Sequence, residues 1–310
     1  MSTPMSVRSR MDARTSSGII GPPSPRAGQY ARAVAPGKRH ASPRDRGQPG
    51  IVEEANPTGA RSALSEVLLV YVVVAVATFA ITRLRWVAYL KDYVHLGVGA
   101  LFLLVALRMT GRDRPALDRF GIALGGLLAP AEDSEDRPAG PLGIYDLGRL
   151  ARRSLPSALR ETGVALALAA VIFPPFFFGF AWWHGAQGWP RWSLPHDFAS
   201  FAFAQLLVVA LPEEVFFRGY VQTRLDDHFG RPSSKLFLKL GVHPASLVLQ
   251  ALLFALVHFV AIHNPARLAV FFPGLLFGVV RAWRGGVGAA IVLHALSNVY
   301  SDLLVRGWLR

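Results

Sequence analysis

Seven stretches of this sequence are apolar over a length sufficient to cross a lipid bilayer, and they constrain the fold more than any other feature. A hydrocarbon core of about 30 Å needs roughly 20 helical residues to span it. Apart from closed β-barrels, only helices satisfy their backbone hydrogen bonds there. We therefore predict an all-α, polytopic membrane helix bundle of about seven transmembrane helices. The stretches are 63–82, 93–109, 161–183, 197–220, 244–262, 267–283 and 288–304.

The first 62 residues differ in character from the rest of the chain. They contain ten Lys/Arg against four Asp/Glu, are rich in Pro, Gly, Ser and Ala, and carry no long apolar run. Such a segment cannot bury enough apolar surface to offset the entropy of ordering, so we predict a disordered basic N-terminal tail over 1–62. No motif or aromatic framework for nucleic-acid binding accompanies these charges, so no nucleic-acid partner is predicted.

The membrane domain is predicted over 63–310, with two N-terminal spans in 63–109 and a loop over 110–160. Basic residues gather in the segments that share a side with the N-terminus, so the tail and this loop are predicted to be cytoplasmic. The composition favours a bacterial protein of the inner (cytoplasmic) membrane. Pro174-Pro175 predicts a kink or break in the third span.

Polar and ionisable residues inside three of the spans form a pattern of pairs. Charged side chains are costly within a bilayer and mark function by default. Each pair is four residues apart, which places its members on one face of a helix. The pairs are Glu214 and Arg218 (with Glu213 adjacent), Phe254 and His258, and His294 and Asn298. Glu213 lies about 100° around the helix from Glu214, so the two carboxylates need different partners. Gly274 and Gly278, also four apart, are interpreted as simple helix packing.

These pairs, in this order, resemble the three-motif signature of the CPBP family (CAAX proteases and bacteriocin-processing proteins, also called Abi). The family includes the type II CAAX prenyl endopeptidases. The resemblance covers about 154–304, which we therefore predict to be the catalytic core. It implies an intramembrane glutamic protease that forms no covalent intermediate.

The resemblance also implies a role for each matching residue. Glu213 corresponds to the general base and His258 to its partner in positioning and activating water. His294 and Asn298 correspond to the oxyanion stabilisers. Supporting positions fall to Glu214, Arg218 and Phe254. Amide hydrolysis does need a base for water and hydrogen-bond donors where negative charge develops, so the residue types agree with these roles.

A metal-dependent site is the chemical alternative. The prediction is that no cofactor is required. A divalent metal such as zinc would instead use Glu213, His258 and His294 as ligands, although no His-Glu-x-x-His pair is present.

The predicted partners are the lipid bilayer and a membrane-anchored protein or peptide precursor, cut near its C-terminus and near the cytoplasmic surface. Counting residues puts Glu213 and His294 near the cytoplasmic ends of their spans and His258 deeper. A non-catalytic membrane scaffold or immunity protein is the alternative function. A proton-coupled transporter would also place Glu and His in spans, but the two halves of the chain lack matching motifs.

Overall fold

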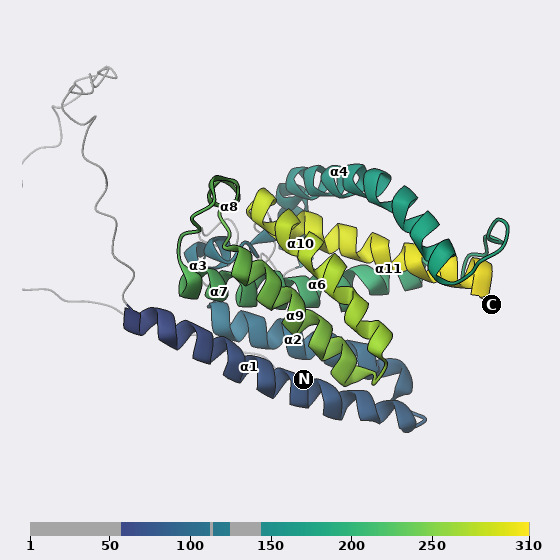
Figure 1. Ribbon diagram of the computed structural model, residues 1–310, viewed down its shortest axis with the longest axis horizontal. Helices are drawn as coiled ribbons and strands as arrows, with labels where there is room; N and C mark the ends of the chain where they lie inside the picture. The colour runs from purple at the N-terminus through teal and green to yellow at the C-terminus, as the bar shows by residue number, and fades with distance from the viewer. Residues whose placement is uncertain (1–56, 112–113, 125–143, 310) are drawn as a thin grey trace, which may run out of the picture. The chain divides into compact units, whose positions relative to one another are not determined.

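The computed structural model describes residues 57–111, 114–124 and 144–309, and all regular structure within them is helical (Figure 1). Seven helical segments are long and apolar enough to cross a membrane, which confirms the predicted fold class. Residues 1–56 of the predicted tail, and 112–113 and 125–143 of the predicted 110–160 loop, lie outside the described residues. The described parts depart from both predictions, because residues 57–62 are helical and the predicted loop contains the helix Arg114–Arg119 and the start of the helix that begins at Ile144 and runs into the third span. The candidate spans are Ser62–Trp86, Lys91–Thr110, Arg152–Trp183, Phe198–Phe229, Pro244–Ala261, Pro265–Arg284 and Gly288–Leu309.

The first two spans form an antiparallel pair, α1 (Pro57–Arg83) and α2 (Val94–Thr110), followed by the short α3 (Arg114–Arg119). Specific polar contacts tie this pair to the later helices. The Tyr71 hydroxyl of α1 donates to the Leu253 carbonyl oxygen at 3.0 Å. Glu66 accepts two hydrogen bonds from the Arg224 guanidinium, at 3.1 and 2.6 Å. The N-terminal pair is therefore an integral part of the packed bundle.

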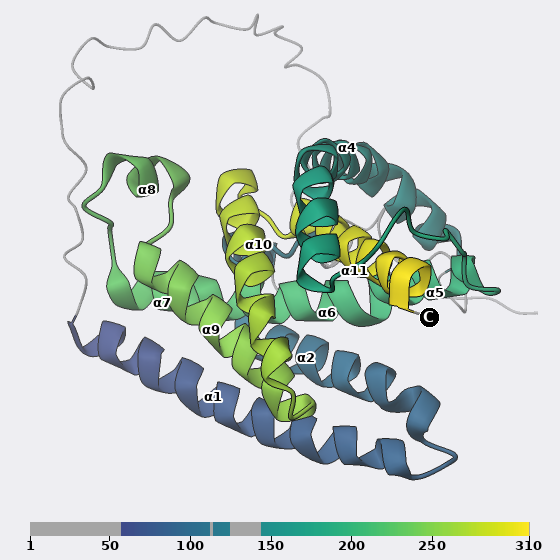
Figure 2. The same ribbon diagram turned by 45° about the vertical axis from the view of Figure 1, so that its right-hand side comes forward.

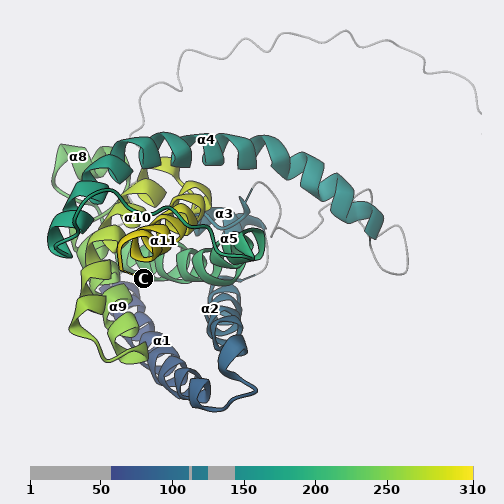
Figure 3. The ribbon, with the colours of Figure 1, turned by 90° about the vertical axis from the view of Figure 1, so that its right-hand side faces the viewer.

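The third span belongs to α4 (Ile144–Trp183), a helix of 40 residues. The helix begins 17 residues before Glu161, the predicted start of the span, and its first part is rich in polar residues. A kink or break was predicted at Pro174-Pro175. The helix continues through both prolines, so no break occurs, and the ribbon curves along its length (Figure 3). Curvature at proline follows from the lost backbone hydrogen bond and the ring's clash with the preceding turn. α4 packs on α11 (Gly288–Leu309), on the side away from α1.

The fourth span is a continuous helical rod built from alternating geometries. It consists of α5 (Phe198–Ala204), a π-helical segment (Gln205–Ala210), α6 (Leu211–Glu214), a second π-helical segment (Val215–Val221) and α7 (Gln222–Phe229). It ends nine residues beyond the predicted Tyr220. Glu213 consequently lies near the middle of this span, not near its end, where it can meet residues of other helices.

The remaining helices follow this rod in the chain. They are α8 (Lys235–Leu240), α9 (Pro244–Ala261), a 3-10 segment (Pro265–Val270), α10 (Phe271–Arg284) and α11. α6 lies against α11, and the π-helical segment after it lies against α9 and α10 (Figure 2). The fourth, fifth and seventh spans, which carry the polar pairs, therefore meet inside the bundle.

Candidate active site

The two adjacent glutamates lie in α6, a single turn of α-helix between two π-helical segments. π-helical turns are uncommon and are frequently found at functional sites, because they redirect side chains relative to a regular helix. Every residue from Pro212 to Thr223 is buried, the two carboxylates and Arg218 included. The sequence predicted the polar residues of this span but gave no indication of the π geometry.

Glu214 is the centre of a buried ionic cluster. Its Oε1 accepts from Arg218 Nη1 at 2.9 Å and lies 2.8 Å from His294 Nδ1. Neither the Glu214 nor the Arg218 side chain is exposed at all. Arg218 also donates to the Gly274 carbonyl oxygen at 3.1 Å, and its guanidinium lies 4.2 Å from the centre of the Phe254 ring. The two residues that the sequence placed on one helix face form an ion pair, and its contacts extend to three further helices, α9, α10 and α11.

Glu213 faces two histidines from different helices. Its Oε2 lies 3.8 Å from His258 Nε2 and 3.8 Å from His294 Nε2, beyond direct hydrogen-bond distance in both cases. This oxygen is buried and has no hydrogen-bond partner among the described residues. The structure thus brings together Glu213, His258 and His294, and gives the two carboxylates different surroundings. His294 was not expected to contact both of them.

His258 is the most exposed of the three, with 23% of its side chain accessible, against 11% for Glu213 and 6% for His294. It lies in the last turn of α9, where its Nδ1 is 2.8 Å from the Phe254 carbonyl oxygen. A carbonyl oxygen can only accept, so Nδ1 carries the proton and Nε2, which faces Glu213, has a free lone pair in the neutral ring. The site therefore opens at His258.

Asn298 lies one turn beyond His294 on α11, and its Nδ2 donates to Gln205 Oε1 at 3.0 Å. This contact fixes the amide of Asn298. The sequence analysis did not identify Gln205. The available signal was a polar amide side chain in an otherwise apolar span.

The glycine pair of α10 has a larger role than the simple packing predicted. The Gly274 carbonyl oxygen accepts from Gln250 Nε2 at 3.0 Å as well as from Arg218, and the Gly278 carbonyl oxygen accepts from Gln222 Nε2 at 3.1 Å. A methyl group at Gly278 would lie 2.6 Å from Gln250 Nε2. Small residues here let buried polar side chains reach the α10 backbone.

Aromatic rings enclose the two histidines. The Phe277 ring stacks on His294 at a centroid distance of 4.9 Å, and the Phe254 ring meets His258 edge-on at 4.5 Å. Phe254 thus contacts both Arg218 and His258, which agrees with a supporting position. Phe277 was missed, because a phenylalanine in an apolar span carries no distinguishing signal.

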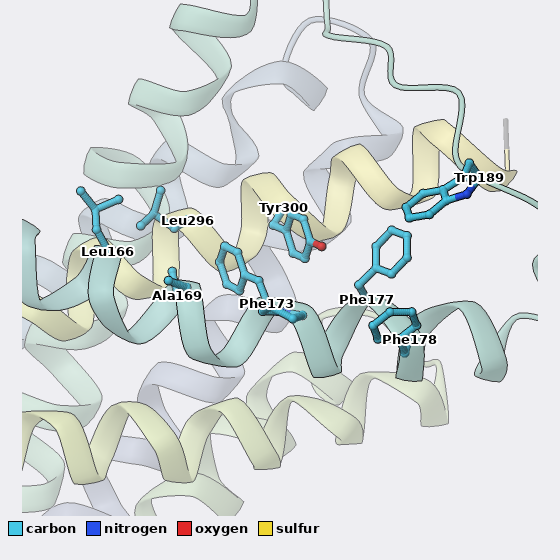
Figure 4. A pocket seen from close by; sticks show the side chains of 10 residues that line it. Leu166, Ala169, Phe173, Phe177, Phe178, Trp189, Leu296 and Tyr300 are labelled. Carbon is cyan, nitrogen blue, oxygen red and sulfur yellow. The ribbon is translucent and has the colours of Figure 1, made fainter.

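A separate hollow of about 540 Å³ lies between α4, α11 and the segment that follows α4 (Figure 4). Its lining is apolar and aromatic and includes none of the candidate residues. The lining residues are Leu166, Ala169, Ala170, Phe173, Pro174, Phe177, Phe178, Trp189, Leu296 and Tyr300.

Among the described residues, no group of three or more His, Cys, Asp or Glu side chains has the spacing of a metal site. The set proposed for the metal-dependent alternative, Glu213, His258 and His294, does converge, but at the 3.8 Å separations given above.

Comparison with known proteins identifies one family. Residues 195–300 match the family model described as type II CAAX prenyl endopeptidase Rce1-like. The match includes all seven candidate residues, from Glu213 to Asn298. Neither a curated protein nor a solved structure matches the chain. Over residues 195–300 the chain thus contains a domain of the Rce1-like type II CAAX prenyl endopeptidase (CPBP/Abi) family, set within seven candidate membrane spans.

Proposed function

We propose that this protein is an intramembrane endopeptidase in which Glu213 and His258 activate water, and His294 and Asn298 stabilise the oxyanion. Family membership supports a protease. The observation that carries the residue assignment is the convergence of His258 Nε2 and His294 Nε2 on the same Glu213 oxygen, each at 3.8 Å.

The geometry around His258 supports its role in holding the water. With Nδ1 donating to the Phe254 carbonyl oxygen, Nε2 is an acceptor, and an ionised Glu213 offers only acceptors. Two acceptors 3.8 Å apart suit a water molecule that donates one hydrogen to each. The lone pairs of that water then point away from both residues, toward a substrate carbonyl carbon. Glu213 takes the proton as the water oxygen attacks.

The contacts of His294 support it as a donor. His294 Nδ1 lies 2.8 Å from Glu214 Oε1, which accepts, and its Nε2 faces Glu213. In the proposed mechanism both ring nitrogens carry protons, and Nε2–H is the one that donates to the substrate. The Asn298 amide has a second N–H beyond the one bound to Gln205. Both groups suit a developing oxyanion.

The reaction is then a balanced hydrolysis. The water oxygen forms a bond to the carbonyl carbon, the carbonyl oxygen gains charge, and Glu213 holds the proton. When the C–N bond breaks, Glu213 returns that proton to the leaving nitrogen, which gives a carboxyl and an amine product. The substrate class we propose is a membrane-anchored protein or peptide precursor, processed near its C-terminus in a bacterial inner membrane.

The test compares cells that express the wild type with cells that express Glu213→Gln, by mass spectrometry of newly formed protein C-termini. Glu161→Gln is the matched control, because it makes the same chemical change in a glutamate that pairs with Arg284, outside the cluster. We expect new termini with the wild type and Glu161→Gln, and none with Glu213→Gln. Equal termini in all three strains, with full complementation by Glu213→Gln, would favour the scaffold or immunity function.

A chelator distinguishes the metal-dependent alternative. Purified wild type is expected to keep its activity after incubation with a divalent-metal chelator. Loss of activity that zinc restores, together with measured zinc binding lost in His258→Ala, would assign Glu213, His258 and His294 as ligands instead.

A further inference from the structure

The opening of the candidate site lies beside an arginine whose side chain has no hydrogen-bond or ion-pair partner in the described part of the chain. Arg267 is exposed and belongs to the 3-10 segment Pro265–Val270, between α9 and α10. This segment packs against α9, whose last turn carries His258, the exposed member of the site. Among the described residues, its side chain makes no hydrogen bond, ion pair or aromatic contact.

The backbone beneath Arg267 is held in place by the segment's own hydrogen bonds. The Asn264 side chain accepts from Ala266 N at 3.0 Å, and the Asn264 carbonyl oxygen accepts from Arg267 N at 2.9 Å. At the other end, Ile262 N donates to the His258 carbonyl oxygen at 3.0 Å, which joins the segment to the last turn of α9. Arg267 is thus presented at a defined place relative to His258.

The neighbouring arginines differ in being engaged. Arg83 Nη2 lies 3.3 Å from His263 Nδ1, and its guanidinium stacks on Phe79. Arg85 donates to the Ala261 carbonyl oxygen at 2.8 Å. Both fasten the end of α1 to the end of α9. Arg267, in the α9–α10 connection, keeps its donors free as far as the described residues go, and a neutral His258 cannot neutralise its charge.

A guanidinium with free donors matches a carboxylate, which it can bind by two parallel hydrogen bonds. We propose that Arg267 binds a carboxylate of the substrate, at the chain end or on an acidic side chain close to the scissile bond, and so selects where the chain is cut. The chain-end carboxylate is the source we favour. This inference rests on the proposed protease function and adds a specificity determinant to it. Arg267 contacts the substrate away from the reacting atoms.

The experiment uses the purified full chain in liposomes and an N-terminally acylated decapeptide library with a free C-terminus. The same library with a C-terminal amide serves for comparison. The variants are Arg267→Gln, Arg267→Lys and Arg191→Gln. Arg191 is an exposed arginine whose backbone N donates to the Gly307 carbonyl oxygen, thirteen residues from His294 along α11 and so about 20 Å away.

The wild type is expected to cleave the acid library about tenfold faster than the amide library, as measured by kcat/KM. Arg267→Gln should lose that preference by slowing on the acid library alone, Arg267→Lys should keep part of it, and Arg191→Gln should keep all of it. A preference that follows Asp and Glu within the peptides, and disappears in Arg267→Gln, would support the carboxylate site with the side chain as its source.

Two outcomes would overturn the inference while leaving the protease function intact. One is an unchanged acid-to-amide ratio in Arg267→Gln. The other is an equal loss on both libraries that depends on anionic lipid in the liposomes, which would assign Arg267 to lipid phosphate. If the wild type cleaves neither library more than Glu213→Gln does, the proposed function itself fails.

Discussion

His294 Nδ1 lies 2.8 Å from Glu214 Oε1, the same oxygen that accepts from Arg218 at 2.9 Å. This contact joins the ionic cluster of the fourth span to the seventh span. It also leaves the other ring nitrogen of His294 facing Glu213 at 3.8 Å. One histidine therefore links a carboxylate with two close partners on Oε1 to a carboxylate that has none within hydrogen-bond distance among the described residues. The two glutamates should respond differently to the same substitution.

Glu214→Gln is expected to destabilise the fold, and Glu213→Gln to abolish activity without doing so. Loss of the Glu214 charge leaves the buried Arg218 without its paired carboxylate. We expect the free energy of unfolding to fall by about 3 kcal/mol, the lower end of the range for removing one partner of a buried ion pair. The Glu213 side chain makes no direct hydrogen bond to any described residue, so its substitution should change the free energy of unfolding by less than about 1 kcal/mol. Its activity should fall by about 10²–10⁴-fold.

Thermal unfolding in detergent and turnover of an identified substrate measure the two effects. Glu161→Gln again provides the matched control for a glutamate outside the cluster. Equal loss of stability in Glu213→Gln and Glu214→Gln would contradict the separation of roles.

The sequence predicted the spans and a common site for Glu213, His258 and His294. Ionisable side chains inside apolar helices are tolerated when they face the bundle interior and pair with one another. The sequence did not predict which atoms pair. The pairing depends on the two π-helical segments around α6 and on where the fourth span ends. The span ends at Phe229, but its last residues are mostly polar, so hydropathy places the end too early. Gln205 and Phe277 were missed because their contacts are set by helix rotation, which no local pattern encodes.

Gln205→Leu is expected to lower kcat by about ten- to a hundredfold with little change in KM, because Asn298 loses the acceptor that orients its amide. Gln205→Glu retains that acceptor and should restore most of the activity. A parallel loss in both variants, or a rise in KM alone, would show that Gln205 serves packing or substrate binding instead. Steady-state kinetics on the identified substrate separates these results.

Gly278→Ala is expected to destabilise the bundle by about 1–3 kcal/mol, in the range found for overpacked cores. Its methyl group would lie 2.6 Å from Gln250 Nε2 and 3.0 Å from Gln222 Oε1. Gly179→Ala in α4 is the matched control, because nothing lies within 4 Å of its added methyl group. Higher helix propensity should leave that variant unchanged or up to about 1 kcal/mol more stable. Equal unfolding temperatures for the two variants would mean that the α10 contacts are not as tight as described.

Two single-cysteine variants test which membrane face the site opens to. The chain has no cysteine, so a membrane-impermeant maleimide reports only on the introduced thiol. Ala266→Cys lies in the α9–α10 connection, next to the end of the helix that carries His258, and Ser233→Cys lies between α7 and α8; both positions are exposed. With the N-terminus cytoplasmic, as the basic residues predict, the maleimide should label Ala266→Cys in intact cells, and Ser233→Cys should react only after permeabilisation.

That labelling would place the opening at His258 on the outer face. Cleavage is then expected at the outer surface and not near the cytoplasmic surface, where residue counting placed it. The reverse labelling would invert the orientation and return the opening to the cytoplasmic side, and labelling of both in intact cells would mean that one of the intervening helices does not cross the membrane.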